Sequence, residues 1–140
     1  MFFSNNQNQF FSLDIQTGNL NWKQEINSNL RPVIINDFIF TISLEGYLII
    51  LEKNTGNIIR SNYLLNKFKA KNRPKIKPTG FIVGNKNIYL SSNIGRLLVI
   101  DIATGETKTI LKIDNKKISR PAIFNKNLYL ITDNSIIKLN

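Results

Sequence analysis

The sequence predicts an all-β protein built from short antiparallel sheets that repeat along the chain, and three observations support this prediction. First, one phrase recurs three times: an apolar run ends in an acid, and Thr-Gly follows after two variable residues. Second, the apolar runs are short and are bounded by Gly, Asn and Asp, which is typical of strands. Third, β-branched and aromatic residues are abundant, and such side chains fit a pleated, half-buried surface.

The spacing of the recurring phrase gives the size of the repeating unit. Gly18 and Gly56 lie 38 residues apart, whereas Gly56 and Gly105 lie 49 residues apart. The excess of 11 residues equals the length of a basic stretch at residues 67–77, so one insertion explains the irregular spacing. A unit of about 38 to 40 residues made of short strands is typical of a four-stranded propeller blade. We therefore expect a partial β-propeller of about three to four antiparallel blades.

The chain is expected to form a single domain, residues 1–140, from four such units. The units span about 1–30, 31–66, 78–117 and 118–140, with the basic inter-blade insertion at 67–77. Three strands are expected in the first and last units and four in each of the other two, which makes fourteen strands. In the last three units the expected strands are residues 32–35, 38–43, 47–52, 57–61, 81–83, 87–91, 96–101, 106–111, 121–124, 127–131 and 136–139.

The recurring phrase has the composition of a tight turn. Its Gly can adopt a positive φ at little steric cost, and its acid or Thr can accept hydrogen bonds from the exposed amides of the turn. A catalytic or metal-binding role for the acids is disfavoured, because they recur from unit to unit. The expected turn residues are Asp14, Thr17, Gly18, Gly46, Glu52, Thr55, Gly56, Gly95, Asp101, Thr104 and Gly105.

Trp22 stands four residues after Gly18, where the other units have Arg60 and Thr109. Its large ring is expected to cover the junction between adjacent blades, which is a packing role. A platform for a ligand is the alternative, but one tryptophan does not make a stacking site by itself.

The composition disfavours several classes of function. The chain has no cysteine and no histidine, so it lacks disulfides, thiolate nucleophiles, the commonest metal ligand and the commonest general base. We therefore expect no enzyme, with no catalytic residue, no metal ligand and no cofactor. No apolar stretch approaches the roughly 20 residues that span a bilayer. Residues 1–6 also lack the basic and apolar regions of a signal peptide.

Six basic residues alternate in the insertion, and an extended backbone would place all of them on one side. One interpretation is a solvated inter-blade loop, and another is a surface for an anionic membrane or an acidic partner. The net charge of +10 agrees either with a general bias towards Lys, Asn and Ile or with an electropositive surface. Nothing in the sequence resembles a nucleic-acid-binding module. The six residues are Lys67, Lys69, Lys71, Arg73, Lys75 and Lys77.

The recurring phrase and its surroundings resemble the repeats of the pyrroloquinoline-quinone-like (PQQ-like) propeller superfamily. The best match runs from Leu13 through Thr17 and Gly18 to Trp22. The stretch from Gly95 to Gly105 follows the same pattern without the final Trp, and the stretch from Gly46 has Glu52 in place of Asp and Arg60 in place of Trp. The resemblance covers nearly the whole chain.

This resemblance implies one of two functions. Quinoprotein dehydrogenases hold a quinone and calcium with acidic and Asn ligands, a Trp floor and often a vicinal cysteine pair, whereas this chain has no cysteine and no convincing floor. The other branch contains the outer-membrane β-barrel assembly lipoproteins, which are non-catalytic periplasmic scaffolds. Residues 31–40 and the unit that begins at Arg120 look like the closing blades of such a protein. The favoured expectation is therefore a non-enzymatic protein–protein interaction scaffold in the periplasm, associated with the outer membrane and its assembly machinery.

The resemblance also implies about eight blades, a signal sequence and a lipidated amino-terminal cysteine, so the chain is expected to be a carboxy-terminal piece. Open blades expose apolar faces and unpaired strand edges. We therefore expect the chain to pair with a second copy, with missing amino-terminal blades or with another protein. The remaining alternatives are a fragment of a PQQ-dependent dehydrogenase and a truncated repeat protein without independent function.

Overall fold

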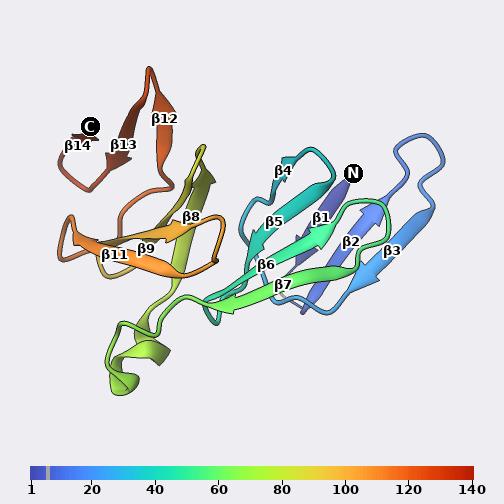
Figure 1. Cartoon of the computed structure of the whole chain (residues 1–140), viewed down its shortest axis with the longest axis horizontal. Coiled ribbons are helices and arrows are strands. Elements are labelled where there is room, and N and C mark those ends of the chain that lie inside the picture. Colours follow the sequence, from blue (N-terminus) through green and yellow to red (C-terminus); the bar gives the residue numbers. More distant parts are fainter. Residues whose placement is uncertain (6) are drawn as a thin grey trace. The chain divides into compact units, whose positions relative to one another are not determined.

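The computed structural model of the chain describes residues 1–5 and 7–140. Asn6, the last residue of the segment inspected for a signal peptide, lies outside the described residues. Antiparallel strands form four sheets of three or four strands each (Figure 1). This is the architecture of a partial β-propeller, so the predicted fold class is confirmed.

In every sheet the order of the strands follows the order of the chain. The first sheet contains β1 (Phe2–Asn5), β2 (Gln9–Leu13) and β3 (Leu20–Gln24). The second contains β4 (Val33–Ile35), β5 (Phe38–Ile42), β6 (Tyr47–Glu52) and β7 (Ile58–Tyr63). After a short 3₁₀ helix, η1 (Ala70–Lys75), the third sheet contains β8 (Pro78–Val83), β9 (Asn87–Ser92), β10 (Arg96–Asp101) and β11 (Thr107–Lys112). The fourth contains β12 (Ala122–Phe124), β13 (Asn127–Ile131) and β14 (Ile136–Leu139).

The described residues form fourteen strands, as the sequence predicts, and β6, β10, β13 and β14 have the predicted bounds. The largest difference is at β8, which begins at Pro78 rather than at residue 81. An irregularity between Pro78 and Gly80 lets these residues join the ladder with β9, and the first position of a strand tolerates a residue without an N–H. That the four units form one domain stays a prediction.

The chain divides into two compact units, residues 1–62 and residues 63–140. In unit 1 the rings of Phe2, Phe10 and Trp22 lie together, with the Trp22 ring centre 6.0 Å from that of Phe10 and 5.8 Å from that of Phe2. Ile39 and Leu51 of the second sheet complete this core cluster. The apolar face of the first sheet is thus buried against the second, and each buried side chain of this kind contributes about 1.5–3 kcal/mol.

Trp22 also brings the two sheets of unit 1 close together. Its Nε1–H donates to the main-chain oxygen of Lys53 at 2.9 Å, and Gln24 Nε2 donates to the oxygen of Gly56 at 2.7 Å. A Cβ atom at Gly56 would overlap the indole ring. The structure therefore places Trp22 at the junction between these two sheets, against the turn that connects β6 to β7.

Unit 2 is organised around the stretch that connects β11 to β12. Ile118 from this stretch is fully buried and packs in a cluster with Leu97, Leu128 and Leu130. The hydroxyl of Thr79 donates to the Ile118 oxygen at 2.8 Å, and Arg120 Nε donates to the Phe81 oxygen at 3.0 Å. The connecting stretch is thus bonded to β8, and its apolar residue fills the space beside β10 and β13.

We predict that replacing Gly56 by Ala costs more than replacing Gly18 by Ala. The two glycines have nearly the same φ, +73° and +74°, but a Cβ at Gly18 would meet no atom within 4 Å. Gly18→Ala should therefore lower the free energy of unfolding by about 1–2 kcal/mol through backbone strain alone. Gly56→Ala should lower the free energy of unfolding by a further amount of about 1–3 kcal/mol, because the added methyl group overpacks against Trp22.

Urea unfolding of both variants measures this difference, with Gly18→Ala as the matched control. Equal losses for the two variants would contradict the packing of the Trp22 ring on Gly56.

Candidate interaction surfaces

Three corners of the chain share one hydrogen-bond pattern, at residues 14–18, 52–56 and 101–105. At each of these acid corners the glycine N–H donates to the main-chain oxygen of the acid, over 2.9, 2.9 and 2.8 Å. Each acid N–H in turn donates at 2.9 Å to the oxygen five residues later, namely that of Asn19, Asn57 and Glu106. All three glycines have φ between +73° and +74°. The repeated phrase therefore forms the same turn in the first three sheets.

The acidic side chains close these turns. Asp14 Oδ1 accepts from the amides of Gln16 and Thr17 at 2.8 and 2.9 Å. Glu52 accepts from the amides two and three residues later at 3.1 and 2.7 Å, and Asp101 does so at 2.7 and 3.2 Å. The hydroxyls of Thr17, Thr55 and Thr104 each accept one further amide at 3.2 Å. The carboxylates thus bond to the backbone of their own corners.

These hydrogen bonds favour the ionised carboxylates. The amides of Thr17 and Gln16 lower the pKa of Asp14, and hydrogen bonds from Thr55 and then Asn54 lower the pKa of Glu52. The pKa of Asp101 is lowered first by Lys108, whose ammonium lies 2.8 Å from its carboxylate, and then by the Thr104 amide. The three carboxylates are therefore charged at neutral pH and stabilise the corners in that form.

Gly46 and Gly95 occupy a second kind of turn, before β6 and β10. Both have positive φ, of +96° and +72°. Their N–H groups donate to the oxygens of Ser43 and Ser92 at 3.0 and 3.4 Å. A Cβ at Gly95 would overlap the main chain of Asp114, so this turn needs glycine for space as well as for φ.

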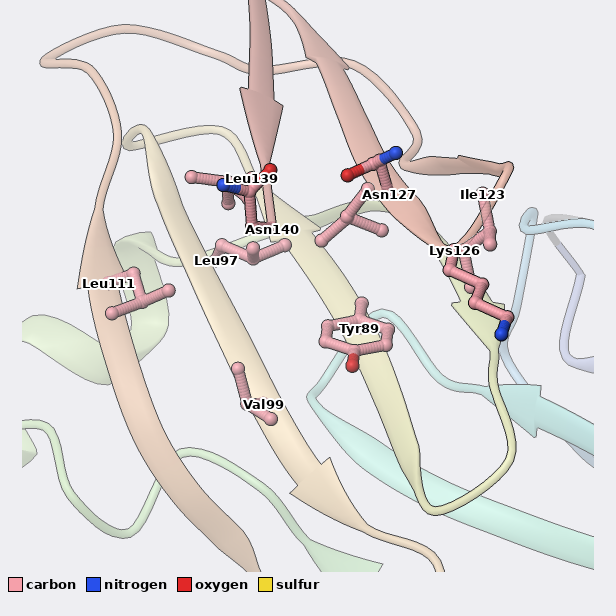
Figure 2. Close-up of a pocket in the computed structure, with 10 residues that line it drawn as sticks. Tyr89, Leu97, Val99, Leu111, Ile123, Lys126, Asn127, Leu139 and Asn140 are labelled. Atoms are coloured by element: carbon pink, nitrogen blue, oxygen red, sulfur yellow. The ribbon is translucent and has the colours of Figure 1, made fainter.

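Unit 2 contains an apolar hollow of about 250 Å³ between its two sheets (Figure 2). Tyr89, Leu97 and Val99 line it from β9 and β10, while Ile123 and Leu139 line it from the fourth sheet. By strand register Tyr89 and Leu97 correspond to Phe2 and Phe10 of unit 1. At the Trp22 position unit 2 has Thr109, so no indole fills the space. The hollow could take an apolar side chain of a partner, and no pattern in the sequence indicated it.

The backbone of the basic insertion is not extended throughout. Residues 70–75 form η1, seen in Figure 1 as a coiled ribbon between β7 and β8. Arg73 explains the difference, because its Nε and Nη2 donate to the oxygens of Phe68 and Asn66 at 3.0 Å each and draw the chain into a turn. The condition under which all six basic side chains would lie on one side is therefore not met at residues 70–75.

Two of the six basic side chains are engaged within unit 2. Arg73 makes the two bonds above and lies over the Tyr63 ring at 5.9 Å. Lys67 Nζ donates to the Lys108 oxygen at 2.7 Å. The other four are exposed, and within the described residues their ammonium groups have no hydrogen bond or ion pair. These four are Lys69, Lys71, Lys75 and Lys77.

Two kinds of site are absent from the described residues. No group of three or more His, Cys, Asp and Glu side chains lies close enough to hold a metal ion. No helix among them has the length and apolar character to cross a membrane.

The sheets and their acid corners define a partial β-propeller. The family model described as outer membrane protein assembly factor BamB matches residues 1–62. The crystal structure of BamB from Moraxella catarrhalis superposes with a TM-score of 0.76 over 98% of this chain, at 14% identity. The resemblance to PQQ-like propellers, and to BamB among them, is therefore confirmed.

Other propellers are similar in fold. The propeller domain of Cps50 (Swd1) from Myceliophteria thermophila matches 95% of this chain with a TM-score of 0.68 at 14% identity. The computationally designed Ika4 protein matches 98% with a TM-score of 0.69 at 13% identity. This chain spans 38% of the BamB chain, 45% of the Cps50 chain and 86% of the Ika4 chain. None of the curated proteins matches the sequence.

We predict that the acid corners make the fold sensitive to acid. A carboxyl whose pKa is lowered by folding stabilises the native state above its ordinary pKa of about 4, and this stability is lost as the pH falls through the lowered value. The free energy of unfolding should be level between about pH 7 and 5 and should decrease below about pH 4.

Urea unfolding across this range measures the effect. A chain with Asp14→Asn, Glu52→Gln and Asp101→Asn should show a shallower decrease below about pH 4. An unchanged decrease would contradict the contribution of the corners.

We predict that Arg73 maintains the conformation of the insertion. Arg73→Gln removes its two bonds to main-chain oxygens, so hydrogen exchange at the Asn72 and Ile76 amides, which close the turns of η1, should become roughly tenfold faster. Lys71→Gln is the control, because it removes a charge from the same helix without removing a contact. Equal exchange rates in the two variants would contradict this role.

Proposed function

We propose that this chain is a non-enzymatic scaffold that binds protein partners during the assembly of outer-membrane β-barrel proteins, on the periplasmic side of the outer membrane. The observation that carries the proposal is the similarity to BamB, which extends over 98% of the chain and is supported by the family model at residues 1–62. The acid corners agree with this proposal, because their carboxylates are bonded to turn amides and stabilise the sheets.

The fourth sheet offers an apolar surface for such a partner. Phe124, Ile131 and Ile136 have exposed fractions of 65%, 57% and 72%, and Ile131 pairs with Ile136 across β13 and β14. Phe124 is opposite Asn127, at the other end of β13, so it lies apart from the pair of isoleucines. Exposed apolar groups of this kind are typical of protein–protein contacts. Pairing with a second copy of the chain or with further blades, which would cover the same sheet, stays a prediction.

Competition with BamB tests the proposal. The full chain is titrated against a purified outer-membrane assembly complex from which BamB has been removed, and BamB is then added. The chain should bind and BamB should displace it. Absence of binding, or binding that BamB does not displace, would contradict the proposal.

A matched pair of variants locates the contact. Phe124→Ser with Ile136→Thr should weaken binding at least about tenfold, which is typical of the loss of an apolar anchor. Ile15→Thr is the control, because Ile15 is 77% exposed on an acid corner of unit 1. Substitutions at exposed positions of this kind change the free energy of unfolding by less than about 0.5 kcal/mol.

Trp22 fluorescence tests the dehydrogenase alternative, because Trp22 is the chain's one tryptophan. Adding pyrroloquinoline quinone with Ca²⁺ should leave its emission unchanged beyond a free-indole control. A saturable change would favour the dehydrogenase fragment instead.

A further inference from the structure

The positive charge of this chain is concentrated in one stretch. Residues 53–100 contain ten Lys and Arg and no Asp or Glu, whereas the rest of the chain contains nine basic and nine acidic residues. The whole net charge of +10 thus comes from about a third of the sequence. A uniform bias towards lysine would spread the excess along the chain, so bias does not explain this distribution.

Within this stretch the four unpaired lysines lie on a fixed segment. Arg73 bonds to the oxygens of Asn66 and Phe68 on one side. On the other side the Asn93 side chain accepts from the Lys77 amide at 2.7 Å and donates to the Lys75 oxygen at 3.0 Å. Ile76, only 3% exposed, anchors the segment in unit 2. The backbone that carries the lysines is therefore arranged before any partner binds, which lowers the cost of binding.

No acid of this chain neutralises the four ammonium groups. The ion pairs of the described residues join Lys53 to Asp37, Lys108 to Asp101 and Lys116 to Asp133, and none involves the insertion. Their field is therefore available to an external anion.

We propose that Lys69, Lys71, Lys75 and Lys77 bind the surface of a bilayer that contains anionic lipids. Anionic lipid surfaces attract clusters of basic residues, as known for clusters of four to eight beside membrane helices or on amphipathic helices, and each lysine near the surface strengthens binding about fivefold. A lysine ammonium is a hydrated point charge that needs no fixed partner geometry, which suits many mobile headgroups. This surface is separate from the fourth sheet and does not depend on the proposed scaffold function.

The chemistry of the segment favours lipid over the other polyanions. The only aromatic residue of the insertion, Phe68, is half-buried and follows no stacking pattern, whereas single-stranded nucleic acids are bound on exposed aromatic platforms. The six-residue η1 is short for reading a duplex groove. Arg73, which could pair bidentately with a carboxylate of a protein, is engaged within unit 2.

Vesicle cosedimentation tests this proposal with two variants of equal net charge. The first replaces the four lysines of the insertion by Gln. The second variant is the matched control and also replaces four lysines by Gln. These are Lys23, Lys112, Lys117 and Lys138, which are exposed and lie outside the insertion. The binding of each variant is measured with vesicles of phosphatidylcholine alone and of phosphatidylcholine with phosphatidylglycerol, at low and physiological salt. Binding to a DNA duplex and to a DNA single strand is measured for comparison.

The native chain should bind the vesicles with phosphatidylglycerol, more weakly as salt rises, and should not bind phosphatidylcholine alone. The insertion variant should lose several hundredfold in affinity, while the control variant should bind within about fivefold of the native chain. Equal losses in both variants would overturn the proposal, because binding would then follow net charge. Absence of vesicle binding, or tighter binding to DNA at the same salt, would also overturn it.

Circular dichroism shows whether the variants fold. Because the four replaced ammonium groups have no hydrogen bond or ion pair within the described residues, the melting temperature should not change. If the insertion variant unfolds, single Lys→Gln variants replace it, and each should weaken vesicle binding about fivefold.

Discussion

The contact between the indole of Trp22 and the backbone at Gly56 is the constraint on which unit 1 depends. A propeller sheet cannot bury its apolar face alone, so the next sheet must come close enough to exclude water. At Gly56 the ring lies where a Cβ would be, and the indole N–H bonds to Lys53 in the same turn. The hydrogen bonds of Glu52 and Thr55 hold that turn in place. One short phrase thus forms the local turn and the surface on which the neighbouring sheet packs.

Unit 2 contains the same kind of acid corner, at residues 101–105, but a different residue packs beside it. Its corner ends at Gly105, and Thr107 just beyond it donates to the Leu64 oxygen at 2.8 Å, so a hydroxyl makes the contact here. With Thr109 in place of a tryptophan, the two sheets of unit 2 leave the apolar hollow beside Tyr89. The repeat therefore forms the same corner in the first three sheets, while the residue four positions after its glycine differs, with Trp22 in unit 1 and Thr109 in unit 2.

The strands were predictable because their signals are local. The glycine turns at Gly46 and Gly95 precede β6 and β10, and the acid corners follow these strands, so the sequence indicates where both strands begin and end. The fold of the insertion was not predictable, because η1 depends on Arg73 reaching back to Phe68 and Asn66, and alternating lysines have no preference for that turn.

The hollow was not predictable either, since its lining comes from two sheets whose packing no single stretch of sequence specifies. The acids of the corners were recognisable from their recurrence, but the engagement of Lys67 by the Lys108 oxygen was not.

Strand order that follows chain order in all four sheets has a consequence for how the protein folds. Every strand pairs with its neighbour in sequence, so closing each hairpin fixes only a short loop and costs little entropy. Contacts between residues close in sequence favour rapid folding, and each sheet can form as soon as its own few strands have left the ribosome. The slow step is then the docking of completed sheets, which must wait for a following repeat to be synthesised.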